Sequence, residues 1–152
     1  MTFDDIGTNP FWIGASGYGA IIPGYGGFNW FKANYLNVSR HSAFGTALTS
    51  GGYVAYNDNL NVSNILTISA NNSARFYMCS VVVAAAQIVQ TPLTLSGVLS
   101  NTIVYTVNIT INSTIPSTLN YTNQPTAVDT VQMFAYGNIF SFDNLVVSGP
   151  SS

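Results

Sequence analysis

One run of eleven residues, TIVYTVNITIN, alternates apolar and polar side chains with a single exception, Val104. Successive side chains of a β-strand point to opposite faces, so this pattern predicts a long antiparallel strand that buries one face and exposes the other. Asn108 and Asn112 are expected on the exposed face. The residues expected to face the core are Ile103, Tyr105, Val107, Ile109 and Ile111.

A second run, RFYMCSVVVAA from Arg75 to Ala85, is apolar on both faces in its second half, which predicts a central strand covered on both sides. Cys79 within this run is interpreted as a small buried apolar residue. Other short β-rich runs alternate with turn residues, and TFDDI at the start is counted as a strand. The prediction is an all-β fold, an antiparallel β-sandwich with a jelly roll of about eight strands.

The length of 152 residues fits one domain, and neither a linker nor a repeat divides the chain. Residues 7–52 hold ten of the 13 glycines, and eight of the 20 aromatic residues lie between Phe11 and Tyr35. Long excursions within compact domains usually carry a function. We therefore expect a single jelly-roll domain over residues 1–152, with a Gly- and aromatic-rich excursion at about 7–52.

Charged residues make up only 5 % of the chain, against roughly 25 % in an average soluble domain. Three basic residues and a net charge of −2 argue against nucleic-acid binding, which requires several Lys or Arg to displace counterions. No apolar run approaches the ~20 residues of a membrane-spanning helix, so membrane insertion is not expected.

The compartment is indicated by glycosylation motifs and by the cysteine content. The lone Cys79 cannot form an internal disulfide. Asn-x-Ser/Thr motifs are typical of surface loops in secreted proteins, and they predict an extracellular glycoprotein, secreted or on the cell surface. The six motifs begin at Asn37, Asn61, Asn71, Asn108, Asn112 and Asn120.

Four motifs are spread over nearly the whole chain: Phe3-Asp4-Asp5, PGYGGFNW (23–30), SGGYVAYN (50–57) and FDNLVV (142–147). Together they resemble a group of secreted jelly-roll domains in fungal and bacterial extracellular proteins, including PEP-CTERM-like sorting-signal proteins. That group is similar in outline to carbohydrate-binding modules. The resemblance implies the jelly-roll fold and a structural calcium ion near paired terminal strands.

The acidic residues allow the same calcium site to be argued from chemistry. Asp4, Asp5 and Asp143 are three of only five acidic residues, and they lie at the two ends of the chain. Calcium binds six to eight oxygens, many from carboxylates. Adjacent strand residues point to opposite faces, so only one of Asp4 and Asp5 is expected to face Asp143. The alternative is that these aspartates cap turns or accept hydrogen bonds from backbone amides.

The sequence contains few of the residue patterns that indicate catalysis. Hydrolysis of sugars needs two carboxyl groups about 5 to 10 Å apart, and Asp4 and Asp5 are expected to diverge. His41 is the only histidine, and no Gly-x-Ser-x-Gly motif accompanies it. His41 is therefore interpreted as a solvated loop residue, and the protein is not expected to be an enzyme.

The segment IIPGYGGFNWF (21–31) combines glycines and rings without any charge. Phe28 and Trp30 are expected to pack inward, whereas the part GYGAIIPGYGG (17–27) is the better candidate for a surface. Sugars stack on flat rings and hydrogen-bond neutral amides. The candidate ligand-binding residues are Trp12, Tyr18, Tyr25, Trp30, Tyr35, Asn29 and Asn34.

Two hypotheses of function follow from the sequence. The first is a non-catalytic glycan-binding module that binds polysaccharide or glycoprotein glycans through exposed aromatic and Asn side chains. The alternative is a structural or adhesive surface domain that self-associates without a small ligand. A concave groove with flat rings would favour the first, and a large exposed apolar patch would favour the second.

Overall fold

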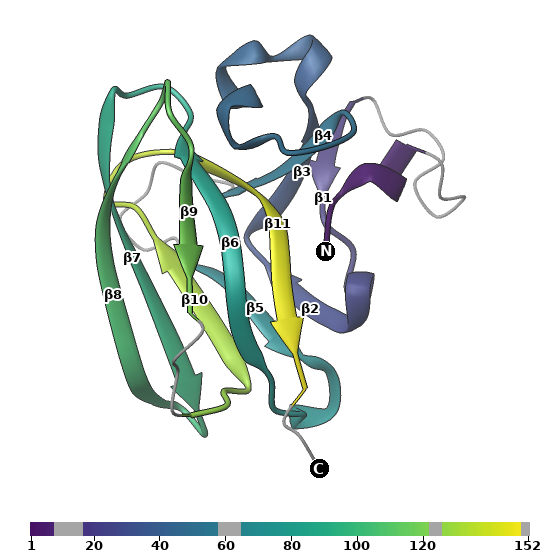
Figure 1. Cartoon of the computed structure of the whole chain (residues 1–152). Helices are drawn as coiled ribbons and strands as arrows, with labels where there is room; N and C mark the ends of the chain where they lie inside the picture. Colours follow the sequence, from purple (N-terminus) through teal and green to yellow (C-terminus); the bar gives the residue numbers. More distant parts are fainter. Residues whose placement is uncertain (8–16, 58–64, 122–125, 150–152) are drawn as a thin grey trace.

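The computed structural model describes residues 1–7, 17–57, 65–121 and 126–149 (Figure 1). Within these ranges the ordered elements are strands and short 3₁₀ helices. The strands are β1 (Tyr18–Ala20), β2 (Phe28–Phe31), β3 (Ala33–Asn37), β4 (Tyr53–Asn57), β5 (Leu66–Ala70), β6 (Tyr77–Ala85), β7 (Gln90–Leu99), β8 (Thr102–Asn112), β9 (Ser117–Asn120), β10 (Thr130–Phe134) and β11 (Phe140–Ser148). The 3₁₀ helices are η1 (Asp4–Gly7), η3 (Tyr25–Gly27), η4 (Val38–Arg40), η5 (Ser42–Ala47) and η6 (Asn71–Ser73).

The strands form two sheets, and every named pair is antiparallel. The six-stranded sheet has the order β1-β3-β4-β11-β6-β9, and the five-stranded sheet has the order β2-β5-β10-β7-β8. The two sheets pack face to face around one apolar core (Figure 1). The predicted antiparallel β-sandwich is confirmed.

The jelly roll comprises the eight strands β4 to β11, which behave as one long folded ribbon. β7 pairs with β8, β6 with β9, β5 with β10 and β4 with β11. The first four strands thus lie antiparallel to the last four. Alternate pairs belong to different sheets: β4–β11 and β6–β9 to the six-stranded sheet, and β5–β10 and β7–β8 to the five-stranded sheet. Strands β1, β2 and β3, from the Gly- and aromatic-rich excursion, extend the two sheets beyond β4 and β5.

The long alternating run forms β8, but its first residues depart from the prediction. Ile111 is fully buried, and Tyr105, Val107 and Ile109 pack against the core, whereas the side chain of Ile103 is 58 % exposed. The pairing with β7 shifts by one residue here, because Gly97 lies opposite Tyr105 and the next residue, Val98, lies opposite Ile103. Val104 is the extra residue of a β-bulge, and a bulge reverses the alternation beyond it. The placement of Ile103 in the core was therefore wrong.

The N-terminal segment also differs from the prediction. The last residues of TFDDI belong to the 3₁₀ helix η1 rather than to a strand, and the segment does not pair with the C-terminal strand. β11 lies between β4 and β6, so both of its edges already have partners. The two ends of the chain nevertheless meet, because the amino group of Met1 donates a hydrogen bond to the carbonyl oxygen of Leu145.

The central position of β6 agrees with its apolar sequence. Residues 81–86 are all buried, as expected for a strand covered on both faces. Cys79 is only half-buried, and its Sγ lies 3.4 Å from Oγ of Ser148, so its interpretation as a small buried apolar residue needs correction. Among the described residues, no helix is long and apolar enough to cross a membrane.

Gly97 provides a test of the β7–β8 packing. The ring of Tyr105 lies over Gly97, and a Cβ at this position would lie 2.1 Å from Cε1 of that ring. Gly97→Ala is expected to lower the free energy of unfolding by about 1 to 3 kcal/mol through overpacking. The matched control is Gly52→Ala, because a Cβ at Gly52 meets nothing within 4 Å. Equal urea midpoints for both variants would contradict this packing.

Candidate functional site

The aromatic residues of the excursion mostly close one part of the core. The ring of Trp30 stacks on Phe142 at 6.4 Å, and Phe3 lies 5.9 Å from the rings of both Tyr25 and Trp30. Nε1 of Trp30 donates a hydrogen bond of 2.8 Å to the carbonyl oxygen of Tyr25. The expected inward packing of Phe28 and Trp30 is confirmed.

Four of the candidate sugar contacts are therefore buried. The side chains of Tyr25, Trp30, Tyr35 and Asn34 are between 4 % and 9 % exposed. The strand alternation turns Trp30 toward the core, and Phe31 of the same strand is 61 % exposed instead. These four residues cannot present a flat surface to a sugar, so their assignment to a binding face is wrong.

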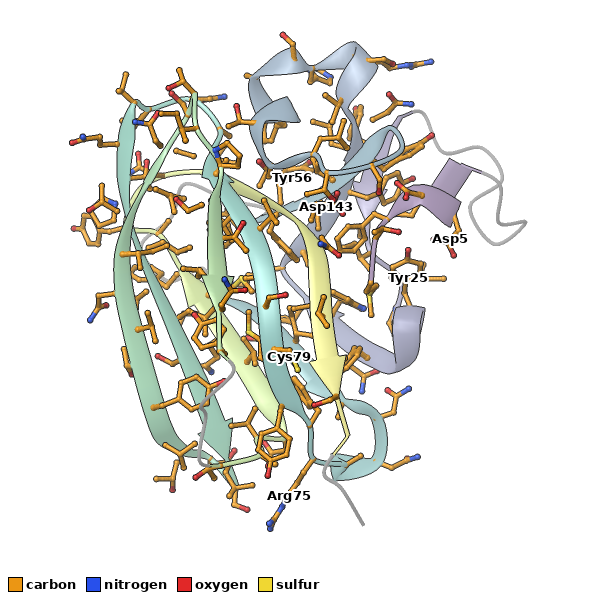
Figure 2. The ribbon with its side chains drawn as sticks, in the orientation of Figure 1. Asp5, Tyr25, Tyr56, Arg75, Cys79 and Asp143 are labelled. Atoms are coloured by element: carbon orange, nitrogen blue, oxygen red, sulfur yellow. The ribbon has the colours of Figure 1, made fainter. Side chains whose placement is uncertain are left out.

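Tyr25 belongs to a hollow beside the N-terminus. Its hydroxyl donates to Oδ1 of Asp5, and the carbonyl oxygen of Thr2 lies 3.2 Å away (Figure 2). Burial raises the pKa of Tyr25 above its usual range, and the hydrogen bond to Asp5 and the negative charges of Asp4 and Asp143 add to this effect. The Tyr25 hydroxyl therefore remains protonated and acts as a donor. The hollow has a volume of about 650 Å³ and is lined by residues 1, 2, 4, 5 and 22–26.

Asp143 has an unusual environment for an acidic side chain. It is fully buried, and its Oδ2 accepts hydrogen bonds from the backbone N of Thr49 at 2.9 Å and from Oγ1 of the same residue at 2.7 Å. Its Oδ1 is buried and has no hydrogen-bond partner among the described residues. Burying a carboxylate oxygen without a hydrogen-bond donor costs free energy. A bound cation would offset this cost, so Oδ1 is suited to act as an oxygen ligand.

Asp4 and Asp5 are less suited to the same cation. Both are exposed, and each accepts a hydrogen bond from a hydroxyl group, Asp4 from Ser50 at 2.7 Å and Asp5 from Tyr25. In the ranges that the structure describes, no three His, Cys, Asp or Glu side chains gather as a metal cluster. Of the three aspartates, only Asp143 therefore suits a bound cation. The expected pairing of neighbouring terminal strands does not occur.

A second concave surface lies on the outer face of the six-stranded sheet. We call it the aromatic groove, and its volume is about 300 Å³. The rings of Phe44 and Tyr56 meet edge to face at 5.2 Å, and Tyr18 is 56 % exposed. The groove is lined by Tyr18, Leu36, His41, Phe44 and Tyr56.

Strand alternation and register place these side chains together. Tyr18 of β1 lies opposite Leu36 of β3, so their side chains share one face of the sheet. Tyr56 of β4 lies opposite Asn34 of β3 and points to that same face. The wall opposite the strands is the segment with η4 and η5, which is held down by a hydrogen bond of 3.1 Å from Oγ of Ser141 to the carbonyl oxygen of Phe44.

The remaining sequence candidates are dispersed. Tyr18 lies in the aromatic groove, whereas Trp12 lies outside the described residues. Asn29 is exposed on the other sheet and borders a polar hollow of about 380 Å³ together with Asn72, Asn101 and Asp129. Tyr56 and Phe44 were not among the residues predicted from the sequence, and His41 was interpreted only as a solvated loop residue. The one available signal was SGGYVAYN, where alternation places Tyr56 two residues from Val54 on the same face.

Comparisons with known proteins bear on the fold. No protein-family model and no curated protein matches the sequence, so the family suggested by the four motifs stays a prediction. Among solved structures, the chain is similar to a DUF4465 family protein from Bacteroides caccae, with a TM-score of 0.61, 10 % identity and 80 % of each chain covered. At this identity the likeness shows the fold alone.

Two weaker likenesses involve larger or more distant structures. One is to the CBM22-1 and GH10 modules of xylanase 10B from Clostridium thermocellum, complexed with xylohexaose, with a TM-score of 0.47 and 15 % identity. It covers 82 % of this chain and 26 % of that one. The other is to the arabinose-bound α-L-arabinofuranosidase MgGH51, with a TM-score of 0.47, 10 % identity, and 90 % and 24 % coverage. Such TM-scores say nothing about a ligand of this chain.

Proposed function

We propose that this chain is a non-catalytic, extracellular glycan-binding module and that the aromatic groove is its binding site. The proposal is carried by one observation: Tyr18, Phe44 and Tyr56 come together in a concave surface on the outer face of a sheet. The C–H faces of a sugar ring are apolar and stack on such rings. A volume of about 300 Å³ accommodates one or two sugar units, and it lies at the lower limit for small-molecule sites.

The polar contacts and the absence of acids in the groove lining support a binding role. His41 is exposed at the groove, where its ring nitrogens can exchange hydrogen bonds with sugar hydroxyls. None of the five lining residues is a carboxylic acid, and glycoside hydrolysis needs two. The proposal is therefore binding without cleavage.

Glycan binding is expected to depend on Tyr18 and Tyr56. Each ring contact contributes on the order of 1 kcal/mol, so Tyr18→Ala and Tyr56→Ala should each weaken binding by about fivefold. The measurement is affinity electrophoresis and pull-down against plant cell-wall polysaccharides and chitin, together with an array of glycoprotein glycans.

The matched control is Phe31→Ala, which removes a similarly exposed ring from the outer face of the opposite sheet and should leave binding unchanged. Retention of both tyrosine variants at the level of the parent protein would contradict the assignment of the groove. Loss of binding in Phe31→Ala alone would move the site to the five-stranded sheet, beside Asn29.

Calcium binding at Asp143 is part of the same proposal, in a structural role. Support comes from Oδ1 of Asp143, which is buried without a hydrogen-bond donor among the described residues. Calcium bound there would neutralise this carboxylate and link β11 to the segment around Thr49, whose backbone N and hydroxyl already contact Oδ2.

The extracellular assignment is also a proposal. Asn120, the first residue of one glycosylation motif, is exposed on β9, where a glycan could be attached without disturbing the core.

A further inference from the structure

Strand β8 forms one edge of the five-stranded sheet. It is eleven residues long and pairs with β7, and no other strand of the described ranges pairs with its second edge. Natural proteins usually protect such an edge with charged residues, proline, a bulge or a covering segment, because an open edge can pair with another chain.

The protection of β8 is limited to its first residues. The bulge at Val104 disrupts the edge there, but residues 105–112 contain no charged residue and no proline. Regular pairing with β7 continues through this part of the strand. Residues 105–112 therefore present an uncharged, regular edge.

We propose that this edge docks a second copy of the same chain, with the two β8 strands antiparallel about a two-fold axis at Asn108. This register is self-complementary, because apolar residues meet apolar residues and hydroxyl side chains meet each other. Such cross-strand pairs are favourable, and the absence of charge removes any like-charge repulsion between copies. The opposed pairs are Tyr105 with Ile111, Thr106 with Thr110, Val107 with Ile109 and Asn108 with itself.

The solvent side of the strand already uses this pairing chemistry within one molecule. Oγ1 of Thr94 on β7 donates to Oδ1 of Asn108 at 2.7 Å, and the hydroxyls of Ser96 and Thr106 are 3.2 Å apart. Asn108 keeps its amide N–H groups as donors for the Asn108 of the second copy. The polar ladder that joins β7 to β8 would thus continue across the dimer.

The size of the contact predicts a weak and reversible dimer. Stable interfaces bury about 1,200 to 2,000 Å² in total, and one strand edge of eight residues provides less. We expect a monomer–dimer equilibrium that depends on protein concentration and joins the two five-stranded sheets into one.

The register is tested by introducing charged residues at two positions on the solvent side of β8. Dimerisation is measured by sedimentation equilibrium over a range of protein concentrations. Thr106→Lys combined with Thr110→Lys places like charges opposite each other and should weaken dimerisation at least about tenfold, or ~1.4 kcal/mol. Thr106→Lys combined with Thr110→Asp places opposite charges at the same positions and should preserve the dimer. Melting curves establish that each variant is folded.

The matched control is Thr118→Lys combined with Asn120→Lys, on the exposed side of β9 at the edge of the other sheet. It adds the same charge as the double lysine change on β8 and should leave the dimer intact. A parent protein that stays monomeric at the highest concentration overturns the proposal, as does equal weakening by both β8 double variants. The glycan experiment does not depend on this result, since it probes a different face.

Discussion

Phe142→Ala is expected to lower the free energy of unfolding by about 3 to 5 kcal/mol, the usual cost of removing a buried aromatic ring. Phe142 is fully buried on β11, and its ring contacts three others, Phe3 at 5.8 Å, Trp30 at 6.4 Å and Phe140 at 6.2 Å. The change would leave a cavity between the jelly roll and the aromatic excursion. Urea denaturation at equilibrium provides the measurement.

Phe31→Ala serves as the control, because the ring of Phe31 is 61 % exposed and its centroid lies 5.3 Å from the ammonium nitrogen of Lys32. It should change the free energy of unfolding by less than about 1 kcal/mol. If the two alanine variants unfold at similar urea concentrations, Phe142 does not hold the excursion in place.

Removal of calcium is expected to destabilise the protein by about 2.7 kcal/mol, compared with calcium at a hundredfold excess over its dissociation constant. The reason is that an ion bound only by the folded state stabilises that state. Thermal melts in millimolar calcium and in chelator give the measurement. Asp143→Asn removes the charge at nearly constant volume and should make the two melting curves coincide.

Asp129→Asn is the matched control for the calcium experiment. Asp129 accepts a hydrogen bond of 2.8 Å from the backbone N of Ser100, in a different part of the fold, so this variant should keep the full response to calcium. If the parent protein melts at the same temperature in both solutions, the calcium proposal fails. Oδ1 of Asp143 would then be satisfied by another donor.

The sheets were predictable because strand signals are local. The alternation in residues 102–112 and the apolar run up to Ala85 correctly located β8 and β6. The exception at Val104 was itself the signal of the bulge, and taking it as such would have placed Ile103 on the outside. β9 was missed because it is only four residues long, directly follows Pro116 and ends at Asn120, and Pro and Asn are typical of turns.

The candidate site was much less predictable, because it depends on contacts between distant segments. Whether Tyr25 is exposed depends on Phe3 and Asp5, which contact it from about twenty positions away. The aromatic groove needs Phe44 of η5 to meet Tyr56 of β4 above the sheet. Composition indicates that aromatic rings are abundant in this chain, but only the tertiary structure determines which of them remain accessible.

The ribbon pairing has a consequence for the order in which the chain can fold. β7 and β8 are joined by Ser100 and Asn101, both in the left-handed conformation that a tight hairpin requires, so this pair can form early from local contacts. β4 must wait for β11, since Ala55 pairs with Phe142. Non-local pairs of this kind close late and make folding slow. During synthesis on the ribosome, β4 to β7 therefore emerge before their partners, and the apolar edges of these nascent strands need protection until the last strand leaves the exit tunnel.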